Sequence, residues 1–199
     1  MNKYIIYLAA GSSRRFGSNK LFYEYAGKPL FRHGLDLLTD FCRHRPDCAL
    51  TVVSRYPEIL EQAEAAGAQA VYSPDSSKGM SYTIKAALRA LPALRDGDFI
   101  LFVVADQPHL TGRTLEKILS YAGPGIETVS ASYDGRPGNP VLFSARLVPE
   151  LMELQGDEGG RKVLKKHKCI FVETENSSEL FDIDTPLCYD NIVDKNDEE

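Results

Sequence analysis

Short apolar segments alternate with segments of helical periodicity along most of the chain, and this alternation restricts the folds that it can adopt. Strand, helix and strand in that order form a βαβ unit, and successive units build a mostly parallel sheet covered by helices. The sequence therefore predicts an α/β protein with three layers, α/β/α, of the Rossmann-like kind. The expected strands are residues 4–10, 49–54, 69–72, 99–105, 128–132, 140–143 and 169–173. The expected helices lie near residues 30–42, 57–66, 81–91, 111–121, 144–153, 158–167 and 186–193.

Two of the expected strands, residues 4–10 and 99–105, are apolar throughout. Strands covered by helices on both faces have this composition, so we place both in the middle of the sheet. In open sheets of this type, ligands bind beyond the carboxyl ends of the strands. The loops that follow Ala10, Tyr72 and Ala105 are therefore the candidate positions for a site.

The length of 199 residues, with 43% hydrophobic and 26% charged residues, suits one globular domain. We expect this domain to span residues 1–189 and to be followed by an acidic, flexible tail over residues 190–199. The tail contains five acids and one lysine and so carries most of the net charge of −5. The rest of the chain is nearly neutral, which argues against nucleic acid and membrane surfaces as partners.

The cysteines and the N-terminal apolar segment favour a cytoplasmic protein. The four cysteines lie far apart and form no CxxC pair, so reduced thiols in a reducing compartment are expected. Residues 4–10 reach only the minimum length for the core of a signal peptide, and Arg14 and Arg15 stand where a cleavage site should follow. No apolar segment reaches the roughly 18 residues that a membrane helix needs.

The loop after the first expected strand has the composition of a polyanion site. Residues 1–23 contain two lysines and two arginines and no acid, and the segment from Gly11 to Lys20 is rich in glycine and serine. Small residues let backbone N–H groups approach a triphosphate, and the cations offset its charge. The segment matches neither the Walker A pattern nor GxGxxG, which weakens the interpretation as a dinucleotide-binding oxidoreductase. Composition alone is equally compatible with a solvated connector.

A family resemblance decides between these interpretations. The run Leu8-Ala9-Ala10-Gly11-x-Ser13-x-Arg15-x-Gly17-x-x-Lys20 resembles the LAAGxSxRxGxxK signature of the MobA-like NTP transferases, and among them it is most similar to the molybdenum cofactor cytidylyltransferases. The resemblance implies a nucleotidyltransferase fold in which Lys20 and Arg15 are catalytic. The residues of this segment that it implies for nucleotide binding are Leu8, Ala9, Ala10, Gly11, Ser12, Ser13, Arg15, Gly17 and Lys20.

Three aspartates are candidate metal ligands. Asp106 ends the apolar segment 99–105, and Asp182 and Asp184 alternate in a segment where both can point to one face. Carboxylates from distant segments, with phosphate oxygens and water, suit magnesium. Taken alone, Asp106 could instead cap a following helix and Asp184 could form an Asx-turn.

The segments that contain these aspartates also match the family. ADQPHLT and FDIDTP resemble its DQP and DIDTP motifs, which implies that Asp106 is catalytic and binds both nucleotide and metal. The same resemblance implies Asp184 as the second ligand of Mg²⁺. We prefer Asp184 to Asp182 in this role, and Asp182 remains the alternative.

Three further segments match the family in order. Residues 78–83 resemble its GMSxS loop, which implies nucleotide contacts for Gly79, Ser81 and Thr83, and Ser81 is also available as the cap of the helix expected at 81–91. Residues 135–141 and 156–161 resemble its GxPGNPV and GDxGxR segments, which implies that Asn139 and Arg161 bind the acceptor substrate. Without the resemblance, Asn139 would be a turn residue and Arg161 a surface cation. The four histidines form no cluster in the sequence, and we assign them no role.

The reaction implied by the resemblance is transfer of CMP from CTP to the phosphate of molybdopterin, with release of pyrophosphate. Relatives that use GTP tend to have LAGG where this chain has LAAG, so Ala10 favours CTP. The implied partners are CTP or another NTP, a molybdopterin-type acceptor, and a molybdoenzyme or its chaperone that receives the product. The alternatives are a GTP-using molybdopterin guanylyltransferase, a sugar phosphate or methylerythritol phosphate nucleotidyltransferase, and a nucleotide-binding regulator without turnover.

Overall fold

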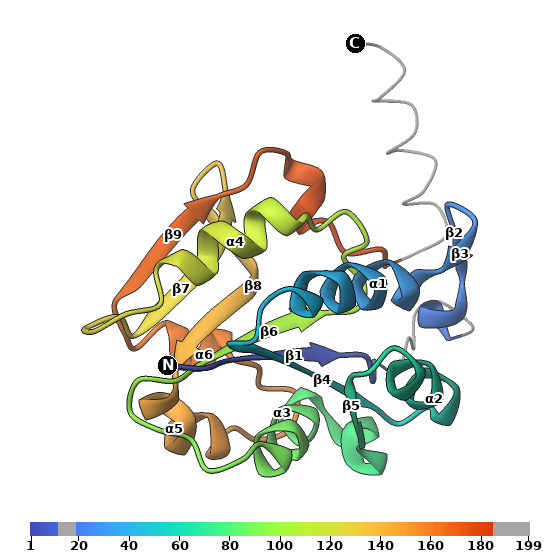
Figure 1. Ribbon diagram of the computed structural model, residues 1–199, viewed down its shortest axis with the longest axis horizontal. Helices are drawn as coiled ribbons and strands as arrows, with labels where there is room; N and C mark the ends of the chain where they lie inside the picture. The colour runs from blue at the N-terminus through green and yellow to red at the C-terminus, as the bar shows by residue number, and fades with distance from the viewer. Residues whose placement is uncertain (12–18, 185–199) are drawn as a thin grey trace.

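A seven-stranded sheet forms the middle layer of the molecule in the computed structural model, which describes residues 1–11 and 19–184 (Figure 1). The strand order across the sheet is β5-β4-β1-β6-β8-β7-β9. The strands are β1 (Lys3–Leu8), β4 (Cys48–Ser54), β5 (Gln69–Tyr72), β6 (Phe99–Val104), β7 (Thr128–Tyr133), β8 (Arg136–Ser144) and β9 (Cys169–Glu173). All seven expected strands are therefore present, and β1 and β6 are neighbours inside the sheet as predicted.

One strand runs against the others. β8 pairs antiparallel with both β6 and β7, whereas β1 pairs parallel with β4 and β6, and β7 pairs parallel with β9. The amino end of β8 consequently lies at the edge where the parallel strands end. β8 also begins at Arg136, four residues before the expected start at residue 140, so Asn139 belongs to a strand and not to a turn.

Helices cover both faces of the sheet, as predicted (Figure 1). α1 (Leu30–Arg43), α2 (Pro57–Ala65) and α4 (Gly112–Ser120) contribute to the core on one face. α3 (Met80–Ala90), α5 (Val148–Met152) and α6 (Arg161–Leu164) contribute to the core on the other. The described residues also form short 3-10 helices, namely η1 (Lys20–Phe22), η2 (Pro74–Lys78), η3 (Ala145–Leu147) and η4 (Ser177–Leu180).

Three expected helices differ from the prediction or lie outside the described residues. The segment expected as one helix at 144–153 divides into η3 and α5. The helix expected at 158–167 is only the four residues of α6, because Gly159 and Gly160 occupy its first turn and glycine disfavours helix. The helix expected at 186–193 lies outside the described residues.

The apolar composition of β1 follows from its two covered faces. Ile5 and Tyr7 belong to the core beneath α1, α2 and α4, and Tyr4 and Ile6 belong to the core beneath α3, α5 and α6. The Tyr7 hydroxyl is buried and donates to the backbone oxygen of Phe31 at 2.8 Å. Successive side chains of β1 thus point alternately into the two cores, and the residues on both faces of the strand are apolar.

A small hairpin beside the carboxyl ends of the strands was not predicted. Its strands β2 (Glu24–Tyr25) and β3 (Lys28–Pro29) have two residues each, too few to show alternation. The Tyr25 hydroxyl lies 2.6 Å from His109 Nε2, and the Tyr25 backbone oxygen lies 2.8 Å from His33 Nε2. Two of the histidines, which are far apart in the sequence, therefore lie on either side of this tyrosine in the fold.

Across residues 1–11 and 19–184, the structure contains no helix that is both long and apolar enough to cross a membrane.

Candidate active site

The first loop leaves the sheet with its backbone fixed on two sides. The Ser54 hydroxyl donates to the backbone oxygen of Ala9 at 2.7 Å, and the Tyr56 hydroxyl donates to the backbone oxygen of Gly11 at 3.0 Å. On the other side, the Ala105 N–H donates to the Leu8 oxygen at 3.2 Å. Ala9 and Ala10 are buried, whereas Gly11 is exposed. Ser12, Ser13, Arg15 and Gly17, which were expected to contact the nucleotide, lie outside the described residues.

Lys20 lies between two aspartates from distant parts of the chain. Its Nζ atom is 2.7 Å from Asp106 Oδ2 and 3.0 Å from Asp184 Oδ1. Burial lowers the pKa of the Lys20 ammonium group, but the charges and hydrogen bonds of Asp106 and Asp184 outweigh this effect, so the pKa lies above its ordinary value. Lys20 therefore carries its charge at neutral pH, at the carboxyl edge of β6.

The two aspartates also suit a metal ion. Both carboxylates converge on one cationic nitrogen, so their oxygens already face a common point. Among the described residues there is no group of three or more His, Cys, Asp or Glu side chains suited to a metal. The carboxylates of Asp106 and Asp184 are of the type that binds a divalent metal together with phosphate oxygens and water.

Asp182 faces a different partner from Asp184. Its Oδ1 accepts a hydrogen bond of 2.9 Å from the Gln107 amide, which also donates to the Leu180 oxygen at 3.2 Å. Partial burial, followed by the nearby charge of Asp106, raises the pKa of the Asp182 carboxyl to about 6. The alternative role of Asp106 as a helix cap has no support, because the side chain of Thr111 caps α4.

The loop before α3 is fixed by close packing against the loop before α6. Gly79 has a φ of +138°, and a Cβ atom there would lie 2.2 Å from the backbone oxygen of Gly156, so only glycine fits. That same oxygen accepts a hydrogen bond of 3.1 Å from the Ser81 N–H. Ser81 lies inside the first turn of α3 and is not its cap, since Gly79 occupies that position. The buried Thr83 hydroxyl donates to Ser76 Oγ at 2.8 Å and so stabilises the loop from within.

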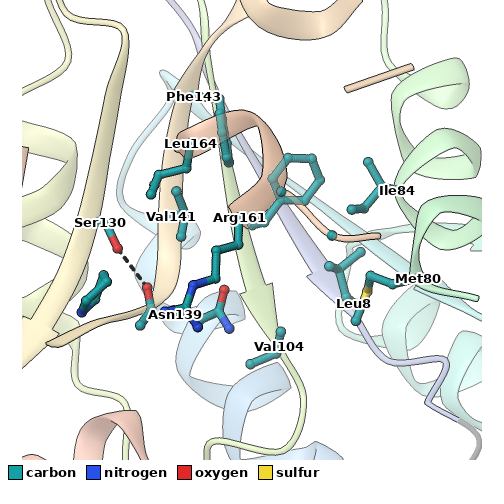
Figure 2. Close-up of a pocket in the computed structure, with 15 residues that line it drawn as sticks. Leu8, Met80, Ile84, Val104, Ser130, Asn139, Val141, Phe143, Arg161 and Leu164 are labelled. Carbon is teal, nitrogen blue, oxygen red and sulfur yellow. Dashed lines mark hydrogen bonds between the residues drawn. The ribbon is translucent and has the colours of Figure 1, made fainter. Parts of the chain in front are cut away.

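A pocket opens beside β6 and β8 at the same edge of the sheet. Figure 2 shows Asn139 and Arg161 with their polar ends together over an apolar floor that includes Val141 and Leu164. The wall opposite contains Leu8 and residues from the first turns of α3. Ser130 Oγ donates to the Gly138 oxygen at 2.8 Å and fixes the start of β8. Within the described part of the chain, neither the Asn139 amide nor the Arg161 guanidinium has a hydrogen bond to protein.

The structure adds a cation that sequence reasoning missed. Arg55 follows β4 directly, its guanidinium lies 4.9 Å from the centre of the Tyr56 ring, and its buried Nε has no hydrogen-bond partner among the described residues. The loops expected to form the site followed Ala10, Tyr72 and Ala105 but not Ser54. The signal was available: residues 49–54 were already expected to form a strand, and parallel strands end at one edge.

Several solved structures share this fold. Solved structures of the same fold include Rv0371c from Mycobacterium tuberculosis H37Rv, at a TM-score of 0.78 and 22% identity over 98% of both chains, which has also been solved in complex with manganese. A nucleotidyl transferase from Methanothermobacter thermautotroptrophicus aligns at a TM-score of 0.75 and 19% identity, over 98% of this chain and 96% of that one. The fold is that of the nucleotidyltransferases.

Sequence comparison gives the family. Residues 5–170 match the MobA-like NTP transferase domain, and the chain belongs to this family of nucleotidyltransferases. It is 30% identical to the purine catabolism protein PucB of Bacillus subtilis (strain 168), over 94% of each chain. It is 26% identical to the molybdenum cofactor cytidylyltransferase of Escherichia coli (strain K12), over 91% of this chain and 90% of that protein.

Proposed function

We propose that this protein transfers CMP from CTP to the terminal phosphate of molybdopterin, forming the cytosine dinucleotide cofactor and releasing pyrophosphate, with Mg²⁺ as the metal. One observation carries the proposal: Lys20 lies 2.7 and 3.0 Å from two aspartates at the same sheet edge as the Asn139–Arg161 pocket. A charge-handling centre and a pocket for an acceptor thus adjoin one another, as transfer between two bound substrates requires.

The transfer is an in-line displacement at phosphorus. An oxygen of the acceptor phosphate forms a bond to the α-phosphorus of CTP, and the bond from that phosphorus to the bridging oxygen of the β-phosphate breaks. Lys20 offsets the negative charge that develops on the α-phosphate and on the leaving pyrophosphate. We assign Arg15 the same task on the triphosphate, and Arg55, at the end of β4, is a further cation within this edge.

Asp106 and Asp184 are the residues that would hold Mg²⁺. When bound, the ion supplies Lewis-acid stabilisation of charge on the phosphate oxygens. The manganese complex of Rv0371c supports a divalent metal in this fold. Lys20 contacts Asp106 through Oδ2 and Asp184 through Oδ1, and the ion would share both carboxylates with the Lys20 ammonium.

The pocket supports a flat acceptor with an anionic arm. Its floor and walls are mostly apolar, which suits the face of a ring system, while the Asn139 amide can pair with ring nitrogens and oxygens. The Arg161 guanidinium suits a phosphate because its N–H groups match two oxygens at once. We propose a molybdoenzyme or its chaperone as the recipient of the product, and the cytoplasm, where NTPs are supplied, as its location.

The base preference has a separate support. Ala10 is buried where the first loop leaves β1, and its place in LAAG favours CTP over GTP. The cytidylyltransferase of Escherichia coli is a relative with that chemistry in its name, whereas the name of PucB states a process and not a reaction. A guanylyltransferase is the second candidate, since a probable molybdenum cofactor guanylyltransferase of Bacillus subtilis is 24% identical over 86% of this chain.

One experiment tests the proposal. The full chain is supplied with molybdopterin, Mg²⁺ and each NTP in turn, and pyrophosphate release is measured. We expect release with CTP that depends on molybdopterin. A faster reaction with GTP would assign the chain to the guanylyl branch. Binding of NTP without pyrophosphate from any combination would exclude molybdopterin as the acceptor and leave a different acceptor or a regulator without turnover.

A further inference from the structure

The segment that contains Asp184 is held against the molecule at several separate points. We call residues 177–184, which comprise η4 and the four residues after it, the strap. Asp184 at its end approaches Lys20, and the strap is far from Lys20 and Asp106 in sequence. The position of the second carboxylate therefore depends on whatever fixes the strap, and a side chain that does so acts on the site without touching substrate.

At its first half, the strap is fixed to the start of α4. Glu179 is 1% exposed, and its Oε2 accepts hydrogen bonds from the Thr111 N–H at 3.1 Å, the Thr111 hydroxyl at 2.8 Å and the Thr114 hydroxyl at 2.7 Å. The next residue, Leu180, packs against Gly138, where an added Cβ would lie 3.1 Å from Leu180 Cδ1. These contacts fix where the strap begins, but they lie several residues from Asp184.

At its second half, the strap is fixed to the residue next to Asp106. The Gln107 amide nitrogen donates both to the Leu180 oxygen at 3.2 Å and to Asp182 Oδ1 at 2.9 Å. Both partners only accept hydrogen bonds, so the nitrogen of the Gln107 amide must face them. The Ile183 N–H donates to the Asp106 oxygen at 2.9 Å, and the Ile183 side chain is fully buried with Tyr25 and Leu30.

We infer that Gln107 is a positioning residue for Asp184: its amide holds the strap in the register that brings the Asp184 carboxylate beside Asp106. Asp182 is then the anchor of the strap on Gln107 and not a ligand of the metal. Alternation assigns the two aspartates to one face of an extended segment, but their partners differ, since Asp182 meets an amide and Asp184 meets Lys20. The inference rests on the proposed function only in treating Asp184 as a metal ligand.

The central test compares two glutamine variants of the full chain. Gln107→Ala removes the hydrogen bonds to the strap, whereas Gln69→Ala removes a similar hydrogen bond, from the Gln69 amide to the Ala90 oxygen at 3.2 Å, on β5. Amide hydrogen exchange at Ile183 is measured in both, because that N–H reports the register of the strap directly. We expect exchange at Ile183 to be at least about 10-fold faster in Gln107→Ala and unchanged in Gln69→Ala, with the Ala105 amide protected in both.

The metal is tested separately with Mn²⁺ in the presence of CTP, by the loss of the free-ion resonance signal. We expect binding about 10-fold weaker in Gln107→Ala and unchanged in Gln69→Ala, the size expected for misplacing one of two protein ligands. Asp182→Asn keeps an oxygen for the Gln107 amide and should bind Mn²⁺ almost as the unmodified protein does. If Gln107→Ala loses thermal stability, Gln107→Met removes the amide while filling most of its volume.

The outcomes separate this inference from the proposed function. Unchanged exchange at Ile183 and unchanged Mn²⁺ binding in Gln107→Ala would overturn the role of Gln107. Weaker Mn²⁺ binding in Asp182→Asn than in Gln107→Ala would make Asp182 a ligand and also overturn it. Absence of pyrophosphate release by the unmodified protein, with Mn²⁺ still bound through the strap, would instead count against the proposed function alone.

Discussion

The centre around Lys20 and the pocket around Arg161 lie at the same edge of one sheet, yet they are built in opposite ways. Lys20 is 9% exposed and is held by two carboxylates at 2.7 and 3.0 Å. Arg161 is exposed, begins a helix of four residues, and has no ion pair among the described residues. One cation is thus fixed by the protein itself, and the other has no ion pair within the described part of the chain.

This difference predicts that one region contributes mainly to the reaction rate and the other mainly to substrate binding. A fixed, partly buried charge is already oriented when charge develops on a phosphate, so we expect Lys20 to act mainly on the rate. An exposed guanidinium over an apolar floor would gain its hydrogen bonds only when a substrate arrives, so we expect Arg161 to act mainly on binding. The two loops that border the pocket touch at Gly79 and Gly156, so the pocket must be tested with variants that leave this contact intact.

The largest effect is expected from Asp106→Asn. The substitution keeps the shape of the side chain but removes the charge that would hold the metal and pair with Lys20. We expect kcat to fall by about 10³-fold, corresponding to about 4 kcal/mol, with little change in Tm. Steady-state pyrophosphate release and thermal unfolding measure the two quantities.

The matched control is Asp98→Asn, at the opposite end of β6. Asp98 is 1% exposed and accepts hydrogen bonds from the backbone N–H groups of Asn2 and Arg95, so its loss should lower Tm and leave kcat nearly unchanged. Equal losses of kcat in the two variants would remove the distinction between a functional and a structural aspartate on this strand.

A smaller effect is expected from Lys20→Met, which keeps the length of the side chain without its charge. We expect kcat to fall by about 10²-fold while the KM for CTP changes only a few-fold, because the ammonium acts on charge that develops in the transition state. Lys3→Met is the control, since Lys3 forms a comparable pair with Asp47 at 2.6 Å at the start of β1. An effect of Lys20→Met confined to KM would show that Lys20 only holds the ground-state triphosphate.

Substitution in the Arg161 pocket should change KM and not kcat, the reverse of the effect expected at Lys20. Arg161→Ala is expected to raise the KM for molybdopterin by about 10-fold and to change the KM for CTP little, as one charge-assisted contact to a phosphate is lost. Lys162→Ala is the control, because Lys162 is the next residue and is paired with Glu158 on the surface. A fall in kcat without a change in the KM for molybdopterin would place Arg161 in the charge-handling centre instead.

The same two regions show how much of the structure could be predicted from the sequence. The strands were predictable because most contain a short, largely apolar segment between turn residues, and the placement of Asp106 follows from its position just after β6. The antiparallel direction of β8 has no local signal, since direction depends on how the chain crosses the sheet. Asn139 was therefore a turn residue by local reasoning and a strand residue in the fold.

Long-range contacts account for most of what the sequence did not predict. Gln107 meets the strap over 75 residues of chain, and Tyr25 meets His109 over 84, so neither pairing leaves a periodic pattern. The two-residue strands of the hairpin are likewise too short to show a periodic pattern. Thr83 was expected at the nucleotide from the motif, whereas its hydroxyl contacts Ser76 inside the loop, a placement that only the packing of α3 determines.

The smallest effect concerns the nucleobase, and it tests whether the fixed region also contributes to specificity. Ala10 is 4% exposed at the end of a backbone segment fixed by Ser54 and Ala105, and we expect the methyl group there to limit the size of the ring that fits beside it. Removing one methyl changes a pocket contact by about 1 to 3 kcal/mol at most, so Ala10→Gly should reduce the preference for CTP over GTP several-fold without reversing it. The ratio of kcat/KM for the two nucleotides, measured in both proteins, gives the answer. Gly97, before the start of β6, provides the control, because an added Cβ there meets nothing within 4 Å and Gly97→Ala should leave the ratio unchanged. A ratio that does not move in Ala10→Gly, or a preference for GTP in the unmodified protein, would remove Ala10 as a determinant and leave base selection to groups elsewhere on the edge, of which Arg55 at the end of β4 is the first to test.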